Sequence, residues 1–163
     1  MERGTKDKSV DWILVVDDDE GLCDLAVRTL KRNGFSAASS HSGHSALEDI
    51  EKLKPALLML DYRLPDMTGE DLVKKLQDKG APVPFVMMTG QGDEMLAVSI
   101  MKLGAEDYLI KDTELIDRIP GVAGRILQAI GINRKLAQAE EELKLAANVF
   151  THSSEGILIT DAN

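Results

Sequence analysis

Two unbroken runs of apolar residues limit what this chain can fold into. They span residues 12–16 and 56–60, contain no alternating polar positions, and are each followed directly by an aspartate. Such runs are typical of strands that are buried on both faces, as in a parallel sheet covered by helices. Strands with one solvated face would instead alternate between apolar and polar residues. The two runs therefore predict a parallel sheet between layers of helices.

Shorter segments at 35–39, 85–88 and 108–110 predict three further strands. Segments with apolar residues at helical spacing separate the strands, and a last helix is expected to start near Thr113. Strands that alternate with helices are typical of α/β proteins, in which right-handed crossovers place helices on both faces of the sheet. We therefore expect a doubly wound, five-stranded parallel sheet with a helical extension at its C-terminal end.

The predicted strands deliver polar residues to one edge of the sheet. The residues at these strand ends are Asp17, Asp18, Asp61, Thr89, Gly90 and Lys111. Because ligands bind such sheets at the carboxyl ends of the strands, we expect these residues to form a site. Three neighbouring carboxylates repel each other, and carboxylate oxygens are ligands that Mg²⁺ prefers. The edge is thus a candidate magnesium site.

The same residues suggest phosphoryl-transfer chemistry. With a metal bound, one aspartate could act as a nucleophile towards phosphorus and form an acyl phosphate. Lys111 could stabilise charge on the phosphoryl group, the Thr89 hydroxyl could donate a hydrogen bond to it, and Gly90 leaves open space beside it. Each residue alone also has an ordinary explanation, such as a helix N-cap within the acidic run 17–20 or a turn at Asp61. Their convergence on one edge favours the site.

Four sequence segments carry a specific resemblance to a known family. They are VVDDDE, LLMLDYRLPDMTG, VMMTGQGD and MKLGAEDYLIK, in this order, within about residues 13–130. This part of the chain resembles the receiver domain of two-component response regulators. The resemblance implies a flavodoxin-like sheet with strand order 2-1-3-4-5. It also implies that the phosphoryl donor is a histidine kinase or a phosphotransfer protein.

The resemblance further implies roles for individual residues around Asp61, which would be the phosphoacceptor. Asp18 would bind Mg²⁺ directly, Asp17 would lie close to the ion, and the backbone carbonyl of Arg63 would complete the metal site. Arg63 and Gln91 occupy positions that tune dephosphorylation in the family. Apart from its own Mg²⁺-dependent phosphorylation and dephosphorylation, the chain is not expected to be an enzyme.

The resemblance also implies a switch, in which Tyr108 turns inward when Thr89 moves towards the phosphoryl group. One position departs from the family, which usually has proline after the lysine, whereas Asp112 follows Lys111 here. A cis peptide bond before a residue other than proline costs about 2.5–4 kcal/mol, so we expect this peptide to be trans. The extra carboxylate could weaken the pairing of Lys111 with phosphate.

Two other functions stay open from the sequence. A receiver-like interaction module without phosphorylation would be consistent with Asp112. A phosphatase acting on external substrates would normally carry a second acid two residues after its nucleophile, where this sequence has Arg63. The complete acidic set at the strand ends argues against the interaction module, and the missing second acid argues against the phosphatase.

The composition of the chain changes after Gly131. We expect an N-terminal tail over 1–10, the receiver domain over 11–131 and a linker helix over 132–150. Apolar residues recur in the linker at spacings of four and three: Ile132, Leu136, Ala139, Leu143, Ala146 and Phe150. This heptad seam predicts a homodimer through a coiled coil. A single amphipathic helix packed on a neighbouring domain is the alternative.

The end of the chain has a second, shorter resemblance. Residues 145–150 and 153–161 are similar to the entry into a PAS sensory domain, so 151–163 would be its truncated start. Residues 156–160 are predicted to be a strand of that domain. With the rest of the domain missing, the segment is expected to be disordered, to extend the helix or to pack on a second copy. The receiver would regulate the PAS and output domains beyond it.

Charge and composition argue against several partners and locations. Asp and Glu outnumber Lys and Arg by 28 to 19, which gives a net charge of −9, whereas nucleic acids and anionic membranes require a clustered basic surface. Cys23 is the only cysteine, so no internal disulfide can form. The N-terminus lacks a signal-peptide pattern, and no segment reaches the ~18 apolar residues of a membrane helix. We therefore expect a cytoplasmic protein that binds neither nucleic acid nor membrane through this region.

Overall fold

The computed structural model describes residues 10–90 and 94–161, with side chains described to residue 149. Its strands are β1 (Trp12–Val16), β2 (Ser36–Ser40), β3 (Leu57–Asp61), β4 (Phe85–Thr89) and β5 (Asp107–Ile110). Its helices are α1 (Glu20–Arg32), α2 (Gly43–Leu53), α3 (Gly69–Asp78), α4 (Glu94–Leu103) and α5 (Leu115–Asp161). The strands form one parallel sheet in the order β2-β1-β3-β4-β5. The predicted doubly wound sheet and its strand order are confirmed.

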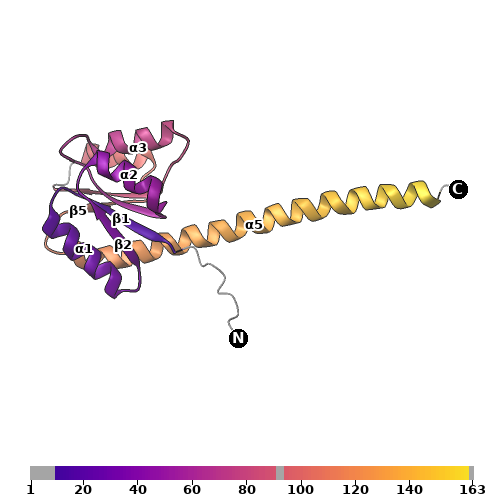
Figure 1. Cartoon of the computed structure of the whole chain (residues 1–163), viewed down its shortest axis with the longest axis horizontal. Helices are drawn as coiled ribbons and strands as arrows, with labels where there is room; N and C mark the ends of the chain where they lie inside the picture. Colours follow the sequence, from indigo (N-terminus) through magenta and orange to yellow (C-terminus); the bar gives the residue numbers. More distant parts are fainter. Residues whose placement is uncertain (1–9, 91–93, 162–163) are drawn as a thin grey trace. The chain divides into compact units, whose positions relative to one another are not determined.

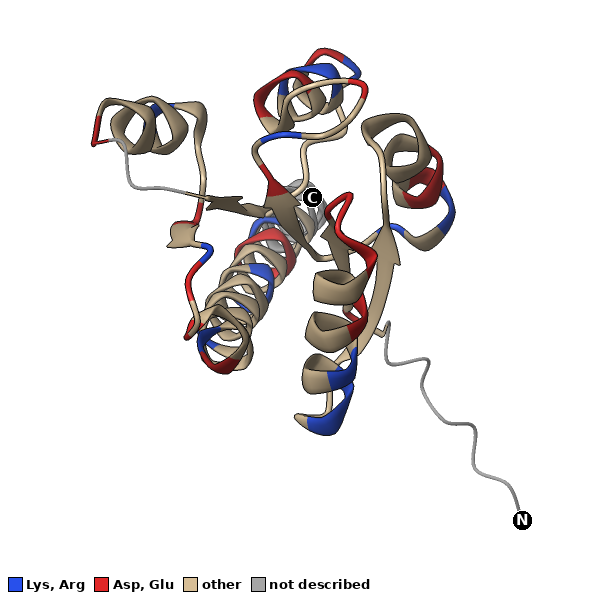
Figure 2. Cartoon of the chain, turned by 90° about the vertical axis from the view of Figure 1, so that its left-hand side faces the viewer, with Lys and Arg blue, Asp and Glu red and all other residues tan. Residues whose placement is uncertain are grey.

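Helices cover both faces of this sheet. The helices α2, α3 and α4 lie on one face, and α1 and the first turns of α5 lie on the other (Figures 1 and 2). Alternate residues of each strand face opposite layers. On the first face, Leu14 and Leu60 pack in one cluster with Leu72 of α3 and Ile100 of α4. The sheet is therefore the middle layer of three.

The inner strands β3 and β4 are buried along their whole length. In β1, residues 13–16 are also fully buried. Burying an aliphatic side chain contributes about 1.5–3 kcal/mol relative to leaving it exposed. This gain explains why the apolar runs without alternation occupy the inner strands of the sheet.

Strand register brings the strand ends to the same level. Val16 pairs with Leu60, so the residues that follow β1 lie beside the end of β3. Thr89 pairs with Ile110 at the other side of the sheet. The backbone N–H of Lys111 then donates to the Thr89 carbonyl at 2.7 Å. These pairings bring the residues after β1, β3 and β5 to one edge.

The acidic run after β1 is divided between a helix cap and the sheet edge. The Asp19 side chain accepts a hydrogen bond of 3.0 Å from the backbone N–H of Leu22, so Asp19 is the N-cap of α1. Asp17 and Asp18 are thereby left for other contacts. Figure 2 shows acidic segments where the central strands end.

The last helix corrects one prediction. Residues 156–160, predicted as a strand, belong to α5, which is continuous from Leu115 to Asp161. A lone strand would leave its backbone hydrogen-bonding groups without partners, whereas a helix pairs them within the same segment. Of the three outcomes expected for this segment, the structure has the helix extension. The helix begins two residues after the expected Thr113.

The chain divides into two units, 1–127 and 128–163. In the second unit, residues 132–149 are exposed along the helix. Two parts of the sequence-based interpretation, the tail before residue 10 and the role of Gln91, lie outside the described residues. Within the described part of the chain, no helix combines the length and apolar character that crossing a membrane requires.

Candidate functional site

Three carboxylates meet at the carboxyl edge of the sheet. Asp17 follows β1 and is fully buried, Asp61 ends β3 and is 6% exposed, and Asp18 is exposed. One oxygen of each lies within 4.8 Å of the others. The convergence predicted from the strand ends is therefore present for these three residues. Oxygen donors at this separation fit a hard divalent cation such as Mg²⁺.

The backbone at the end of β1 is held by several contacts. The Asp17 N–H donates to the Ser40 carbonyl at 3.1 Å, which extends the pairing with β2. The Asp17 carbonyl accepts a hydrogen bond of 3.3 Å from the buried Cys23 thiol and lies 3.1 Å from Nδ1 of His41. The Asp17 side chain accepts from the Asp19 N–H at 2.9 Å. These contacts fix the direction in which Asp17 points.

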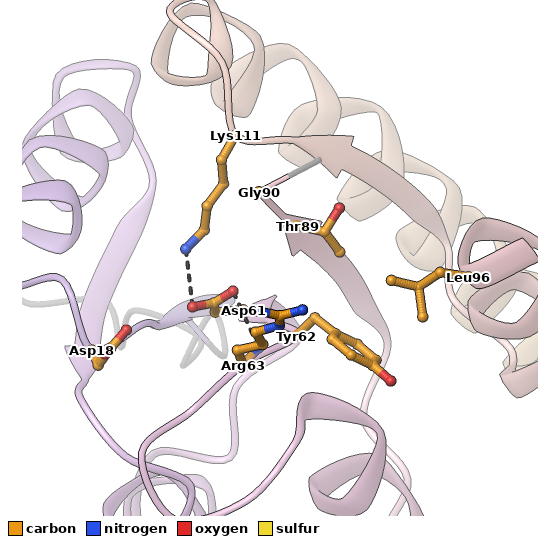
Figure 3. A pocket seen from close by; sticks show the side chains of 8 residues that line it. All are labelled: Asp18, Asp61, Tyr62, Arg63, Thr89, Gly90, Leu96 and Lys111. Atoms are coloured by element: carbon orange, nitrogen blue, oxygen red, sulfur yellow. Dashed lines mark hydrogen bonds and ion pairs between the residues drawn. The ribbon is translucent and has the colours of Figure 1, made fainter. Parts of the chain in front are cut away.

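Lys111 reaches back from the end of β5 to two of the carboxylates. Its Nζ lies 2.5 Å from Oδ2 of Asp17 and 2.9 Å from Oδ2 of Asp61, and Figure 3 shows the side chain pointing at Asp61. Burial alone would lower the Lys111 pKa, but the hydrogen bonds that Lys111 donates to both carboxylates outweigh it and raise the pKa. Burial raises the pKa of Asp17, and the bond from Lys111 only partly opposes this shift. One ammonium neutralises only part of the acidic cluster.

The hydroxyls of the predicted switch pair are in contact. Thr89, at the end of β4, is 4% exposed, and its Oγ1 donates to the Tyr108 hydroxyl at 2.8 Å. Tyr108 on β5 is half-buried, with its ring packed against the core cluster on the α4 side of the sheet. The structure thus brings Tyr108 to Thr89 directly.

An open cavity lies over the carboxylates. Its lining residues come from the ends of β1, β3, β4 and β5 and from the start of α4: Asp18, Asp61, Tyr62, Arg63, Thr89, Gly90, Leu96 and Lys111. Figure 3 shows Asp61, Lys111 and Thr89 around the same space. A Cβ atom built on Gly90 would meet no atom within 4 Å, so the space beside Thr89 is open as expected. Tyr62 and Leu96 were not predicted as site residues.

The loop after Asp61 brings its two ends close together, so that Gly69 lies against the backbone of Asp61 and Tyr62. The Arg63 N–H donates to Oδ1 of Asp61 at 3.4 Å, and the Gly69 N–H donates to the Tyr62 carbonyl at 2.7 Å. A Cβ atom on Gly69 would lie 2.6 Å from the Asp61 carbonyl oxygen, so only glycine fits there. Gly69 is a supporting residue that sequence reasoning missed, although its position in a Pro-containing turn was a signal.

Asp112, which departs from the family pattern, has an ion-pair partner that the sequence did not reveal. The Lys111–Asp112 peptide is trans, as expected. The Asp112 carboxylate accepts the backbone N–H of Glu114 at 3.0 Å and forms an ion pair with Arg118. Its negative charge is therefore compensated by a cation of α5.

Comparison with known proteins identifies the class. Residues 13–119 match the response regulator receiver domain family. Over 150 residues the chain is 33% identical to the DNA-binding response regulator MtrA of Mycobacterium tuberculosis, covering 91% of this chain and 65% of MtrA. It is 36% identical over 99 residues to the alkaline phosphatase synthesis transcriptional regulatory protein PhoP of Bacillus subtilis, covering 61% of this chain and 41% of PhoP.

Solved structures agree with this assignment. NtrX from Brucella abortus matches with a TM-score of 0.70 and 31% identity, over 77% of this chain and 29% of NtrX. The BeF3-activated receiver domain of RstA from Klebsiella pneumoniae matches with a TM-score of 0.62 and 28% identity, over 73% of this chain and 97% of that domain. This chain belongs to the response regulator receiver domain family of two-component systems. It spans about two-thirds or less of the length of the curated relatives named above.

Proposed function

We propose that this chain is a phosphoacceptor switch that receives a phosphoryl group on Asp61 from a histidine kinase or a phosphotransfer protein. The observation that carries the proposal is the position of Asp61, whose carboxylate opens into the cavity between Lys111 and the acidic pair Asp17 and Asp18. A nucleophile for phosphorus needs this combination of accessible oxygen and positive charge nearby.

In the proposed reaction, an Asp61 oxygen forms a bond to phosphorus, and the bond from phosphorus to the donor histidine nitrogen breaks. The electron pair of that bond stays on the imidazole, which then takes up a proton. Lys111 already contacts Asp61 and would move its ammonium onto the transferred phosphoryl oxygens. The Thr89 hydroxyl and the open space at Gly90 lie at the same cavity, where a phosphoryl oxygen can be bound.

Mg²⁺ is the metal we propose for the acidic cluster, because three carboxylates are hard oxygen donors. Asp17, Asp18 and Asp61 would hold it, together with the backbone carbonyl of Arg63. When bound, the ion supplies positive charge that offsets the repulsion between carboxylates and phosphoryl oxygens. Asp17 is buried with a raised pKa, so its charge is costly without a further cation beside Lys111.

The switch that we propose starts at Thr89 and Tyr108. When the Thr89 hydroxyl turns to a phosphoryl oxygen, its bond to Tyr108 changes, and the face formed by α4, β5 and α5 repacks. The helix α5 would carry this change to the C-terminal output, and a homodimer would form through its heptad seam. We propose a PAS domain as the first such domain, although MtrA, which this chain resembles, is named as a DNA-binding protein.

The test is intact-mass spectrometry after incubation with acetyl phosphate and Mg²⁺. A single phosphoryl adduct is expected on the wild-type chain, with none after metal removal or in Asp61→Asn. An adduct that persists in Asp61→Asn would place the acceptor elsewhere. A wild-type chain that forms no adduct and binds no Mg²⁺ would favour the receiver-like interaction module.

A further inference from the structure

A single arginine of α5 forms hydrogen bonds to the residues on both sides of Lys111. One terminal nitrogen of the Arg118 guanidinium donates to the Ile110 carbonyl at 3.1 Å, just before the lysine, and to the Asp112 carboxylate, just after it. The Nε of Arg118 also reaches the Glu114 carbonyl at 3.5 Å. The turn that carries Lys111 is thus tied to the first turns of α5.

Asp112 closes the same turn from within. Its N–H donates to the Ile110 carbonyl at 3.0 Å, and its Oδ1 accepts from the Glu114 N–H at 3.0 Å. The Leu115 N–H donates to the Asp112 carbonyl at 3.2 Å, and the Leu115 side chain is buried. Asp112 therefore closes the turn that leads into α5 and offers Arg118 an oppositely charged partner at the same time.

This arrangement bears on the site because Lys111 is a long side chain with four rotatable bonds. Its Nζ meets Asp17 and Asp61 only if the backbone from which it starts is fixed. On the sheet side, the Lys111 N–H is bonded to Thr89. On the other side, the hydrogen bonds and the ion pair of Asp112 and Arg118 hold the turn that carries Lys111. A guanidinium can bind several acceptors in one plane, which an ammonium on a flexible stem does less well.

We propose that Arg118 and Asp112 are positioning residues that hold Lys111 in place for phosphoryl binding at Asp61. The role rests on the proposed phosphorylation, since Lys111 acts there on the phosphoryl group. The side chains of Arg118 and Asp112 are 37% and 47% exposed. An ion pair this exposed contributes little to global stability, so an effect on the site can be measured apart from unfolding.

The experiment measures two affinities by titration of the full chain: that for Mg²⁺ alone, and that for beryllofluoride, a phosphoryl mimic, in saturating Mg²⁺. The variants are Arg118→Ala, Asp112→Ala and the double mutant. Arg125→Ala is the matched control, because Arg125 lies on the same helix and its ion pair of 2.6 Å is with Asp107, at the opposite end of β5 from Lys111. Thermal unfolding of each variant checks that it is folded.

Each single substitution is expected to weaken beryllofluoride binding about fivefold, the upper end for a partly exposed ion pair. The double mutant should lose less than the sum of the two single losses, because the two residues share one ion pair. Affinity for Mg²⁺ alone should stay equal or rise, since Lys111 neutralises the carboxylates that would hold the ion. Arg125→Ala should match the wild type in both titrations. Asp112→Asn, whose amide oxygen can still accept both bonds, should fall between Asp112→Ala and the wild type.

Other results would overturn the proposal. Beryllofluoride affinities of Arg118→Ala and Asp112→Ala equal to that of Arg125→Ala would show that Lys111 needs neither residue. Parallel losses of Mg²⁺ and beryllofluoride affinity would show a general structural defect. If the wild-type chain forms no adduct with acetyl phosphate, the proposed phosphorylation fails and this role fails with it. An adduct on the wild type with unaffected variants refutes the positioning role alone.

Discussion

The hydroxyl of Thr89 donates a hydrogen bond of 2.8 Å to the hydroxyl of Tyr108. One of these residues lines the cavity over Asp61, and the other belongs to β5, the edge strand within the proposed face of α4, β5 and α5. The bond is therefore a direct physical connection between the site and that face. A phosphoryl oxygen on Asp61 would compete with Tyr108 for the Thr89 hydroxyl.

The first prediction concerns the energy of this bond. Thr89→Val and Tyr108→Phe each remove one hydroxyl with little change of shape. Each is expected to lower the free energy of unfolding by about 1 kcal/mol, as is typical for a partly buried hydrogen bond. Chemical denaturation of both variants and the double mutant gives the coupling, expected at about 0.5–1.5 kcal/mol. Strictly additive losses would mean that the two hydroxyls do not stabilise each other.

The second prediction concerns Lys111, which pairs with the buried Asp17 and with Asp61. Without Mg²⁺ at neutral pH, Lys111→Met should lower the free energy of unfolding by about 1–3 kcal/mol, because it leaves two buried carboxylates without their cation. Addition of Mg²⁺ should raise the unfolding temperature of the variant more than that of the wild type. Lys74→Met, which breaks an exposed pair with Glu70, is the control and should change little.

The ion pairs of Lys111 also predict how the stability of the fold changes with pH. The pKa of Lys111 is raised in the folded chain, so its contribution to stability is fully present below the ordinary lysine value of 10.5. That contribution is lost as pH rises through the folded pKa. Wild-type stability should therefore fall more steeply than that of Lys111→Met under alkaline conditions, as measured by urea unfolding. Equal slopes would contradict the ion pairs.

The sheet and the acidic site were predictable from the sequence because they depend on short local patterns. Unbroken apolar runs are typical of strands that are covered on both faces, and each run is followed by the aspartate that it positions. The strand predicted for 35–39 is shifted by one residue to Ser36–Ser40, because its small polar residues give a weak pattern. The prediction of a strand at 156–160 was wrong, because a strand needs a neighbouring strand as its hydrogen-bonding partner, and the local pattern does not reveal whether one is present.

The supporting contacts could not be predicted, because they join residues whose proximity depends on loop geometry. Arg118 meets Ile110 and Asp112 only after the turn into α5 has formed. The hydrogen bond that the Gly43 N–H, at the start of α2, donates to Asp66 joins residues more than twenty positions apart. Tyr62 lines the cavity, but its residue type gives no signal for a phosphoryl site.

The third prediction follows from Asp66, whose carboxylate accepts the backbone N–H groups of Gly43 at 2.8 Å and His44 at 2.9 Å. These bonds lower the Asp66 pKa, so its stabilisation is present above the ordinary value of 3.8 and is lost as pH falls through the folded pKa. Asp66→Asn should reduce stability at neutral pH by less than about 1 kcal/mol, because the carboxylate is exposed.

Acid titration of unfolding distinguishes this effect from a general loss of stability. The difference in free energy of unfolding between the wild type and Asp66→Asn should shrink as pH falls from 3.8 through the lowered folded pKa, at which the wild-type carboxylate becomes protonated. Asp78→Asn, which removes a charge from the last residue of α3, is the control. That change should not lower stability at neutral pH, because a negative charge at a helix C-terminus is unfavourable. A gap that stays constant down to acid pH would rule out the carboxylate bonds as its cause.

The fourth prediction concerns Cys23, whose thiol is fully buried and donates to the Asp17 carbonyl. Burial, and then the nearby charge of Asp17, raises the thiol pKa to about 12. At pH 8 only about one thiol in 10⁴ is then ionised, and the thiolate is the reactive form. Iodoacetamide should modify the native chain far more slowly than the urea-unfolded chain, as followed by mass spectrometry. Comparable rates would show that the end of β1 opens readily.

The last prediction concerns the proposed homodimer and its heptad seam on α5. Ile132, Leu136 and Leu143 are seam residues that are 52%, 57% and 71% exposed in the single chain. Pairing two such helices would bury these side chains at about 25 cal/mol per Å² of apolar surface. Leu136→Glu and Leu143→Glu should therefore shift a dimer to monomer in light scattering. Leu145→Glu is the matched control, because Leu145 is 58% exposed on the same helix but lies off the seam. A monomeric wild type at high concentration, or an equal effect of Leu145→Glu, would exclude pairing through this seam.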